Sequence, residues 1–159
     1  MIEADRSPAG RLATQAQLGR LALARVLLDA GRPDEAGIEI DSVAAALAAL
    51  PASTQAFQAP FLAQLESLRG ERALQRGEAG EAVARFGAAV ELLAPRHHPQ
   101  SPILASARAD LARALAATGD RSRARALADE ARAAFAAAGP AAPHLRRSLA
   151  AADRLLGAR

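Results

Sequence analysis

The chain has 159 residues, of which 51% are hydrophobic and 23% charged, and its formal net charge is +3 at pH 7. This length and apolar content suffice for one domain with a core and exclude a disordered chain. The absence of cysteine excludes a disulfide framework, and three histidines are too few for most zinc sites built from protein ligands alone. We therefore expect neither a metal nor another cofactor.

The N-terminal residues are not expected to form a secretory signal, because Met1–Gly10 carries Glu3, Asp5 and Arg6 and lacks an apolar segment. The longest apolar runs, such as Val43–Leu50, are shorter than the roughly 20 residues that cross a membrane. We expect a cytoplasmic protein that does not contact a membrane.

In chain order, residues 1–11 are expected to be a frayed N-terminal segment, and residues 12–50 the first of three helix–turn–helix pairs. Gly31 ends the first helix of this pair, because glycine adopts the left-handed conformation that closes many helices. Pro33 suits the first turn of the next helix, and Asp34 complements the dipole of that helix.

The second predicted pair covers residues 60–93 and turns at Gly77. Proline-rich breakers with serine or glycine nearby separate the pairs, at residues 51–60, 95–102 and 139–143. These breakers set the boundaries of the repeating unit.

The third pair covers residues 102–138. Its first helix is predicted over Pro102–Thr118 and ends at Gly119, after which Asp120 caps the second helix. Leucines spaced along residues 143–156 amid arginines predict a half-buried capping helix at the C-terminal end. Seven helices are expected in a single domain that covers residues 12–156.

Small residues recur at matching distances from the three turn glycines. The positions are Ala24, Gly70 and Ala112 in the first helices, then Ala36, Ala82 and Ala124, and finally Val43, Ala89 and Ala131 in the second helices, so eight of the nine hold glycine or alanine. Larger apolar residues such as Leu23, Leu27 and Phe86 fit the positions between them. This pattern resembles the tetratricopeptide repeat, and the Pro-Arg-His-His-Pro linker at residues 95–99 is similar to that of its longer, kinesin-light-chain-like variant.

The resemblance implies an all-α, right-handed superhelical solenoid of three helix pairs with a C-terminal capping helix. It also implies a protein–protein interaction scaffold without enzymatic activity, which binds a peptide or protein in its concave groove. Similar arrays occur in bacterial regulators and C-terminal to some bacterial serine/threonine kinases, so the chain is interpreted as the regulatory segment of a larger signalling protein. A plain antiparallel bundle is the alternative fold, and homo-oligomers are compatible with either.

The family's groove positions map onto the first helix of each pair. They are Leu18, Leu21, Arg25, Leu28 and Asp29 in the first pair, Gln64, Ser67, Glu71, Leu74 and Gln75 in the second, and Ser106, Ala109, Asp110, Arg113, Ala116 and Ala117 in the third. Arg25, Glu71 and Arg113 occupy equivalent places, so they predict a ladder of alternating charge. The arginines would bind a ligand carboxylate while Leu21 and Leu28 contact an apolar side chain, unless the ladder residues pair only with one another.

An arginine-rich face offers the alternative function, a helical repeat associated with nucleic acid. It consists of Arg121, Arg123, Arg125 and Arg132. Aromatic residues that could stack on bases are not interleaved with these arginines, and Asp129 dilutes their charge, so nucleic acid is the less favoured partner.

Catalytic motifs give no support for an enzyme. The chain has neither a Gly-x-x-x-x-Gly-Lys phosphate loop nor any lysine. His97 and His98 are adjacent in a linker, whereas a helical zinc pair needs histidines one turn apart. We expect binding without catalysis.

Overall fold

The computed structural model of the chain describes residues 8–50, 58–139 and 143–157, with side chains from Gln15 onward except at Pro143. Within these residues the protein is all-helical. The helices are α1 (Pro8–Asp29), α2 (Pro33–Ala48), α4 (Ala59–Gln75), α5 (Ala79–Leu93), α6 (Pro102–Thr118), α7 (Arg121–Ala137) and α8 (Pro143–Leu156), with a short 3-10 turn, η2 (Ala94–Arg96), after α5. The predicted number of seven helices is thus confirmed for the described residues.

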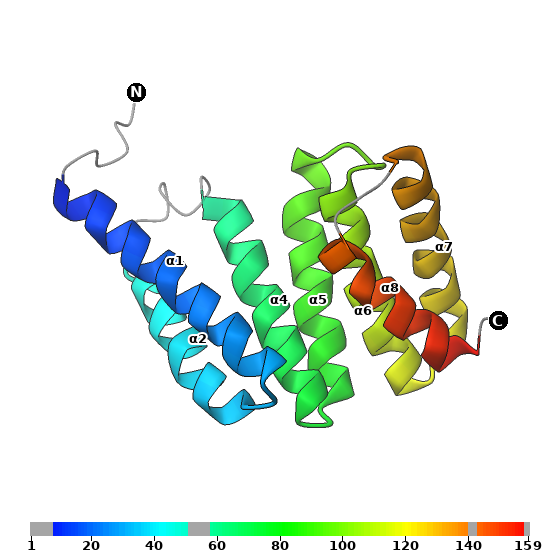
Figure 1. The fold of residues 1–159 in the computed structure, drawn as a ribbon, viewed down its shortest axis with the longest axis horizontal. Coiled ribbons are helices and arrows are strands. Elements are labelled where there is room, and N and C mark those ends of the chain that lie inside the picture. The colour runs from blue at the N-terminus through cyan, green and yellow to red at the C-terminus, as the bar shows by residue number, and fades with distance from the viewer. Residues whose placement is uncertain (1–7, 51–57, 140–142, 158–159) are drawn as a thin grey trace.

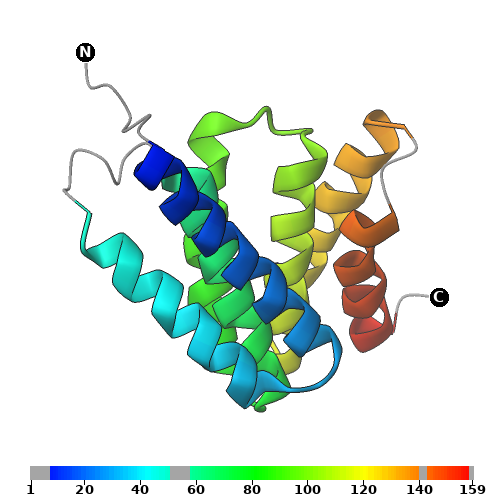
Figure 2. The ribbon, with the colours of Figure 1, turned by 60° about the vertical axis from the view of Figure 1, so that its left-hand side comes forward.

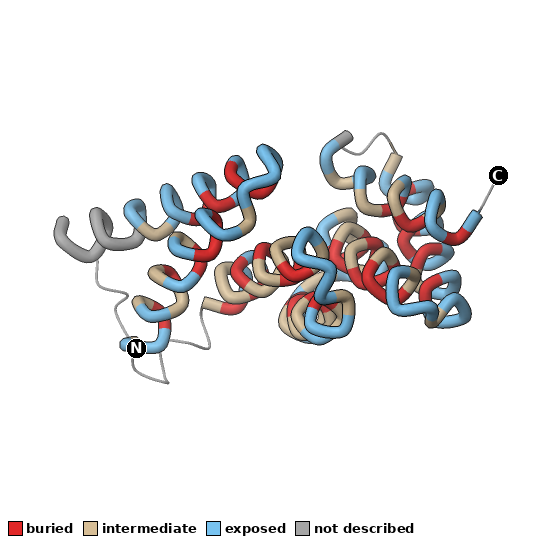
Figure 3. The backbone as a smooth tube through the Cα atoms, turned by 90° about the horizontal axis from the view of Figure 1, so that it is seen from below, coloured by how far each residue is buried: buried red, intermediate tan, exposed pale blue. Residues whose placement is uncertain are grey.

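Each helix packs against its neighbour in the chain, so the fold is a row of helix hairpins (Figure 1). A second set of contacts joins α1 to α4, α4 to α6, and α6 to α8. These four helices therefore form one layer, and α2, α5 and α7 form the other. Seen from below, α1 and α8 stand at the two ends on the same side of the molecule, with α4 and α6 between them (Figure 3).

The turn glycines behave as their positions in the sequence predict. Gly31, Gly77 and Gly119 have φ angles of +71°, +77° and +88°, a left-handed conformation that glycine adopts without a steric penalty. After Gly119, the Asp120 carboxylate accepts a hydrogen bond from the Arg123 backbone N–H at 3.2 Å and caps α7. Local sequence therefore determines where these helices end and begin.

The recurring small residues lie in the contacts between helices. All nine of these positions are buried. At Gly70 of α4, an added Cβ atom would lie 2.7 Å from the ring of Phe86 on α5. Small side chains here let the helix backbones approach, and Phe86 fills the space that remains.

Three sequence predictions need correction or fall outside the described residues. Leu23, expected to fill a gap in the core, is 46% exposed because no described helix packs on its side of α1. The N-terminal segment is shorter than expected, since α1 begins at Pro8, where proline suits the first helical turn. Residues 1–7, 51–57 and 140–142 lie outside the described residues, so most of each predicted breaker at 51–60 and 139–143 does too. No helix of the described ranges is long and apolar enough to span a lipid bilayer.

Candidate functional site: a polar cavity lined by four helices

A cavity of about 560 Å³ opens on the layer formed by α1, α4, α6 and α8. Six of the predicted groove residues line it, namely Arg25, Asp29, Glu71, Ser106, Asp110 and Arg113. Helix α8 completes the lining with four polar residues, His144, Arg147, Ser148 and Arg154. The structure thus brings together charged groups that are far apart in the sequence.

Two of the three ladder residues pair with each other. The Arg113 guanidinium on α6 donates a hydrogen bond to the Glu71 carboxylate on α4, and its side chain is only 19% exposed. The Arg113 guanidinium also lies 3.8 Å from the Asp110 carboxylate and 5.9 Å from the centre of the Phe86 ring. Arg113 is therefore held on several sides, and its charge is largely balanced within the protein.

Asp110 joins α6 to the last helix. Its carboxylate accepts a hydrogen bond from the Ser148 hydroxyl of α8. Burial raises the pKa of Asp110 above its ordinary value, while the Ser148 hydrogen bond and the Arg113 charge act in the opposite direction. The hydrogen bond fixes α8 as one wall of the cavity.

Three arginines of the cavity remain available to a ligand. Arg25, Arg147 and Arg154 are exposed, and none of them has an ion pair with another described residue. With Arg113 balanced by Glu71, these three positive charges face only the carboxylates of Asp29 and Asp110. The cavity therefore favours a ligand with negative charge.

The cavity lining also includes Ser148, His144 and Asp110, but these three residues do not have the arrangement of a catalytic triad. In a catalytic triad the imidazole takes the serine proton and the carboxylate orients the imidazole. Here the Ser148 hydroxyl donates directly to Asp110, and no hydrogen bond links Ser148 to His144 among the described residues.

Several predicted groove residues lie elsewhere. Leu21 and Leu28 are 0% and 1% exposed and belong to the core between α1, α2 and α4, so the prediction that they contact a ligand is wrong. Leu74 is partly buried against the neighbouring core cluster. The Gln75 amide donates to the Leu28 carbonyl at 2.8 Å and ties α4 to α1. Gln64 is exposed and Ser67 is half-buried, and neither lines the cavity.

The residues of α8 were missed because this helix was interpreted only as a cap. Gly157 indicates that α8 is equivalent to the first helix of a pair. It has φ +67° and ends α8 as the other turn glycines end their helices. When the chain is aligned on Gly157 and Gly119, the groove positions of α6 fall on the cavity residues of α8. Ser106, Ala109, Asp110 and Ala116 then correspond to His144, Arg147, Ser148 and Arg154.

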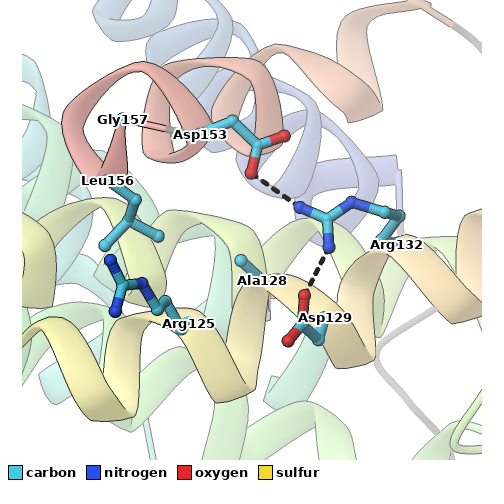
Figure 4. Close-up of a pocket in the computed structure, with 7 residues that line it drawn as sticks. All are labelled: Arg125, Ala128, Asp129, Arg132, Asp153, Leu156 and Gly157. Atoms are coloured by element: carbon cyan, nitrogen blue, oxygen red, sulfur yellow. Dashed lines mark hydrogen bonds and ion pairs between the residues drawn. The ribbon is translucent and has the colours of Figure 1, made fainter. Parts of the chain in front are cut away.

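In the alternative basic face, three of the four arginines are engaged by other groups of the protein. Arg132 donates to the carboxylates of Asp129 and, at 2.7 Å, Asp153, beside a second cavity of about 490 Å³ (Figure 4). Arg121 donates to the Leu156 carbonyl at 2.8 Å, and Arg123 pairs with Asp120 at 3.4 Å. Of the four arginines, only Arg125 lacks an ion pair or hydrogen bond within the described residues.

The described residues contain no group of three or more histidine, aspartate or glutamate side chains placed to hold a metal ion. Comparisons with protein-family models, with curated proteins and with solved structures gave no match.

Proposed function

We propose that the chain is a tetratricopeptide-like helical-repeat scaffold, a right-handed solenoid that binds a peptide or protein partner in the cavity lined by α1, α4, α6 and α8 and catalyses no reaction. The two layers of helices and the burial of all nine recurring small positions support the repeat. We further propose that it serves as a regulatory segment within a larger signalling protein.

The observation that carries the proposal is the set of three unpaired arginines around the cavity. Arg25 projects from one end of the helix layer, and Arg147 and Arg154 from the other. A guanidinium binds a carboxylate through two parallel hydrogen bonds, which gives both strength and orientation. A partner segment with glutamate or aspartate side chains would satisfy these groups, and the four helices would fix its position.

The arginines of α8 are better probes of this proposal than Arg113. Replacing Arg113 would leave Glu71 and Asp110 without their cation, so a loss of binding could come from a rearranged cavity. Arg147 and Arg154 make no ion pair with a described residue, so their substitution removes charge from the cavity and leaves its walls intact.

The test is fluorescence anisotropy with two labelled peptide pools that are identical except for glutamate in one and glutamine in the other. Wild type is expected to prefer the glutamate pool, and the Arg147→Gln/Arg154→Gln variant to bind it at least about tenfold more weakly, since one such contact is worth roughly 1.5–3 kcal/mol. The matched control, Arg123→Gln/Arg125→Gln, loses the same charge outside the cavity and should bind as wild type does. Equal binding of both pools, or equal weakening by both variants, would contradict the proposal.

The competing role, nucleic-acid binding through the face of Arg121, Arg123, Arg125 and Arg132, is tested with the same variants. Labelled duplex DNA and single-stranded RNA replace the peptides, and the salt concentration is varied. Phosphate binding falls steeply and linearly with the logarithm of salt concentration. If the control variant loses such binding and the cavity variant keeps it, the basic face is the functional surface.

A further inference from the structure

The cavity lining contains a histidine in addition to its arginines and carboxylates. The cavity reaches from α1 to α8, which are blue and red in Figure 2. His144 lies in the first turn of α8, one turn before Arg147 and Ser148, so these three residues share one side of the helix. Histidine is the side chain whose charge changes between about pH 5 and 8. His144 can therefore join the three unpaired arginines as a further cation when the pH falls.

Asp110 is a second group whose charge can change. Glu71 and Asp110 both lie against Arg113: Glu71 accepts a hydrogen bond from the guanidinium, and the Asp110 carboxylate lies 3.8 Å from it. The side chains of Glu71, Asp110 and Arg113 are 18%, 19% and 19% exposed. Two carboxylates beside one guanidinium leave one negative charge in excess, and burial makes that charge costly. Burial is the main cause that raises the pKa of Asp110, and the Glu71 carboxylate raises this pKa further.

A bound ligand carboxylate would act on both groups in the same sense. Placed among the three unpaired arginines, it would stabilise a proton on His144 and make the negative charge on Asp110 more costly. Coupling between two binding events is reciprocal, so protons that bind more tightly to the loaded cavity also tighten its hold on the ligand. The other charged groups that line the cavity are Arg25 and Asp29 of α1, Glu71 of α4, Arg113 of α6, and Arg147 and Arg154 of α8.

We propose that the cavity takes up protons when it binds an acidic segment, with His144 gaining a positive charge and Asp110 losing its negative charge. The affinity for the acidic segment then rises as the pH falls from about 7.5 to about 5.5. This inference rests on the proposed function, because it concerns the same ligand in the same cavity.

The glutamate and glutamine peptide pools test this proposal by anisotropy at about pH 7.5 and about pH 5.5, at one salt concentration. Neither pool contains histidine, and glutamate side chains, with an ordinary pKa of about 4.3, stay mostly ionised at the lower pH. Each change of charge at a partly exposed site alters binding by about two- to fivefold. Wild type should therefore bind the glutamate pool at least about threefold more tightly at the lower pH, and the glutamine pool equally at both.

Three variants assign the effect to its residues. His144→Gln should lose part of the gain at low pH. His98→Gln, the matched control, changes an equally exposed linker histidine outside the cavity and should keep the whole gain. Asp110→Asn removes the charge but keeps an oxygen that can accept the Ser148 hydrogen bond. It should bind the glutamate pool more tightly than wild type at about pH 7.5, whereas a purely structural role for Asp110 would make binding weaker.

Titration calorimetry at about pH 6.5 counts the protons directly, when it is repeated in two buffers of different ionisation enthalpy. Wild type should take up protons on binding the glutamate pool, and His144→Gln and Asp110→Asn should each take up fewer. Circular dichroism should show equal helicity in all four proteins at each pH.

The outcomes separate this inference from the proposed function. If wild type prefers the glutamate pool but binds it equally at both pH values and takes up no protons, the inference is wrong and the proposed function stands. An equal loss of the gain in His98→Gln and His144→Gln, or weaker binding by Asp110→Asn, would also overturn the inference. If wild type shows no preference for the glutamate pool at either pH, the proposed function fails and this inference fails with it.

Discussion

Replacing Gly70 with alanine tests the close packing on which the helix row depends. The new Cβ atom would lie 2.7 Å from one atom of the Phe86 ring and 2.8 Å from two others. Phe86 is 1% exposed, so its ring cannot move into solvent. Overpacking of this kind costs about 1–3 kcal/mol, while alanine in a helix interior gains about 1 kcal/mol over glycine.

Gly87 of α5 provides the control, because a Cβ atom added there meets nothing within 4 Å. We expect Gly87→Ala to raise the free energy of unfolding by about 0.5–1 kcal/mol. The free energy of unfolding of Gly70→Ala should be about 1–3 kcal/mol lower than that of Gly87→Ala, because only Gly70→Ala clashes with Phe86. Urea unfolding followed by circular dichroism measures both. In a double-mutant cycle, Phe86→Leu should relieve part of the cost of Gly70→Ala. If Gly70→Ala stabilises the protein as much as Gly87→Ala does, the helices do not approach as closely as described.

Three further predictions concern single residues. Burial raises the pKa of Asp110 above its ordinary value of 3.8. The folded protein therefore holds this proton at pH values where the unfolded chain has lost it, so wild type should gain stability relative to Asp110→Asn as the pH falls toward that ordinary value; urea midpoints that show no such gain would refute this. Asp120→Ala removes the cap that the Arg123 N–H contacts and should cost about 1 kcal/mol in the same unfolding assay, and no loss would mean that the cap does not matter. Gly119→Ala places a side chain at φ +88° and should cost about 1–2 kcal/mol in thermal or urea unfolding, unless the turn adopts another conformation.

Features set by local interactions could be predicted from the sequence. A glycine that ends a helix and an aspartate that caps the next one act within a few residues, so the bounds of α6 and the cap at Asp120 follow from the chain itself. The recurring small residues were also informative. Their constant distances from the turn glycines marked the sides on which the helices meet.

The lining of the cavity could be predicted only in part, because it depends on how helices rotate and pair. Leu21 and Leu28 lie beside the cavity residues of α1, yet contact with α2 and α4 turns them into the core. The charge of the α7 face depends on carboxylates that α8 brings near, such as Asp153 beside Arg132. Only the packed structure reveals these neighbours.

The central claim, that the cavity arginines bind carboxylates of a partner, is tested most directly by NMR of the arginine side chains. Every basic side chain other than histidine is an arginine, so the Nε–H signals report on the cationic groups of the whole chain. On titration with the glutamate peptide pool, the signals of Arg25, Arg147 and Arg154 should shift together and saturate, while those of Arg123 and Arg125 stay in place. Shifts confined to Arg123 and Arg125, or no saturable shift at the cavity arginines, would contradict the claim.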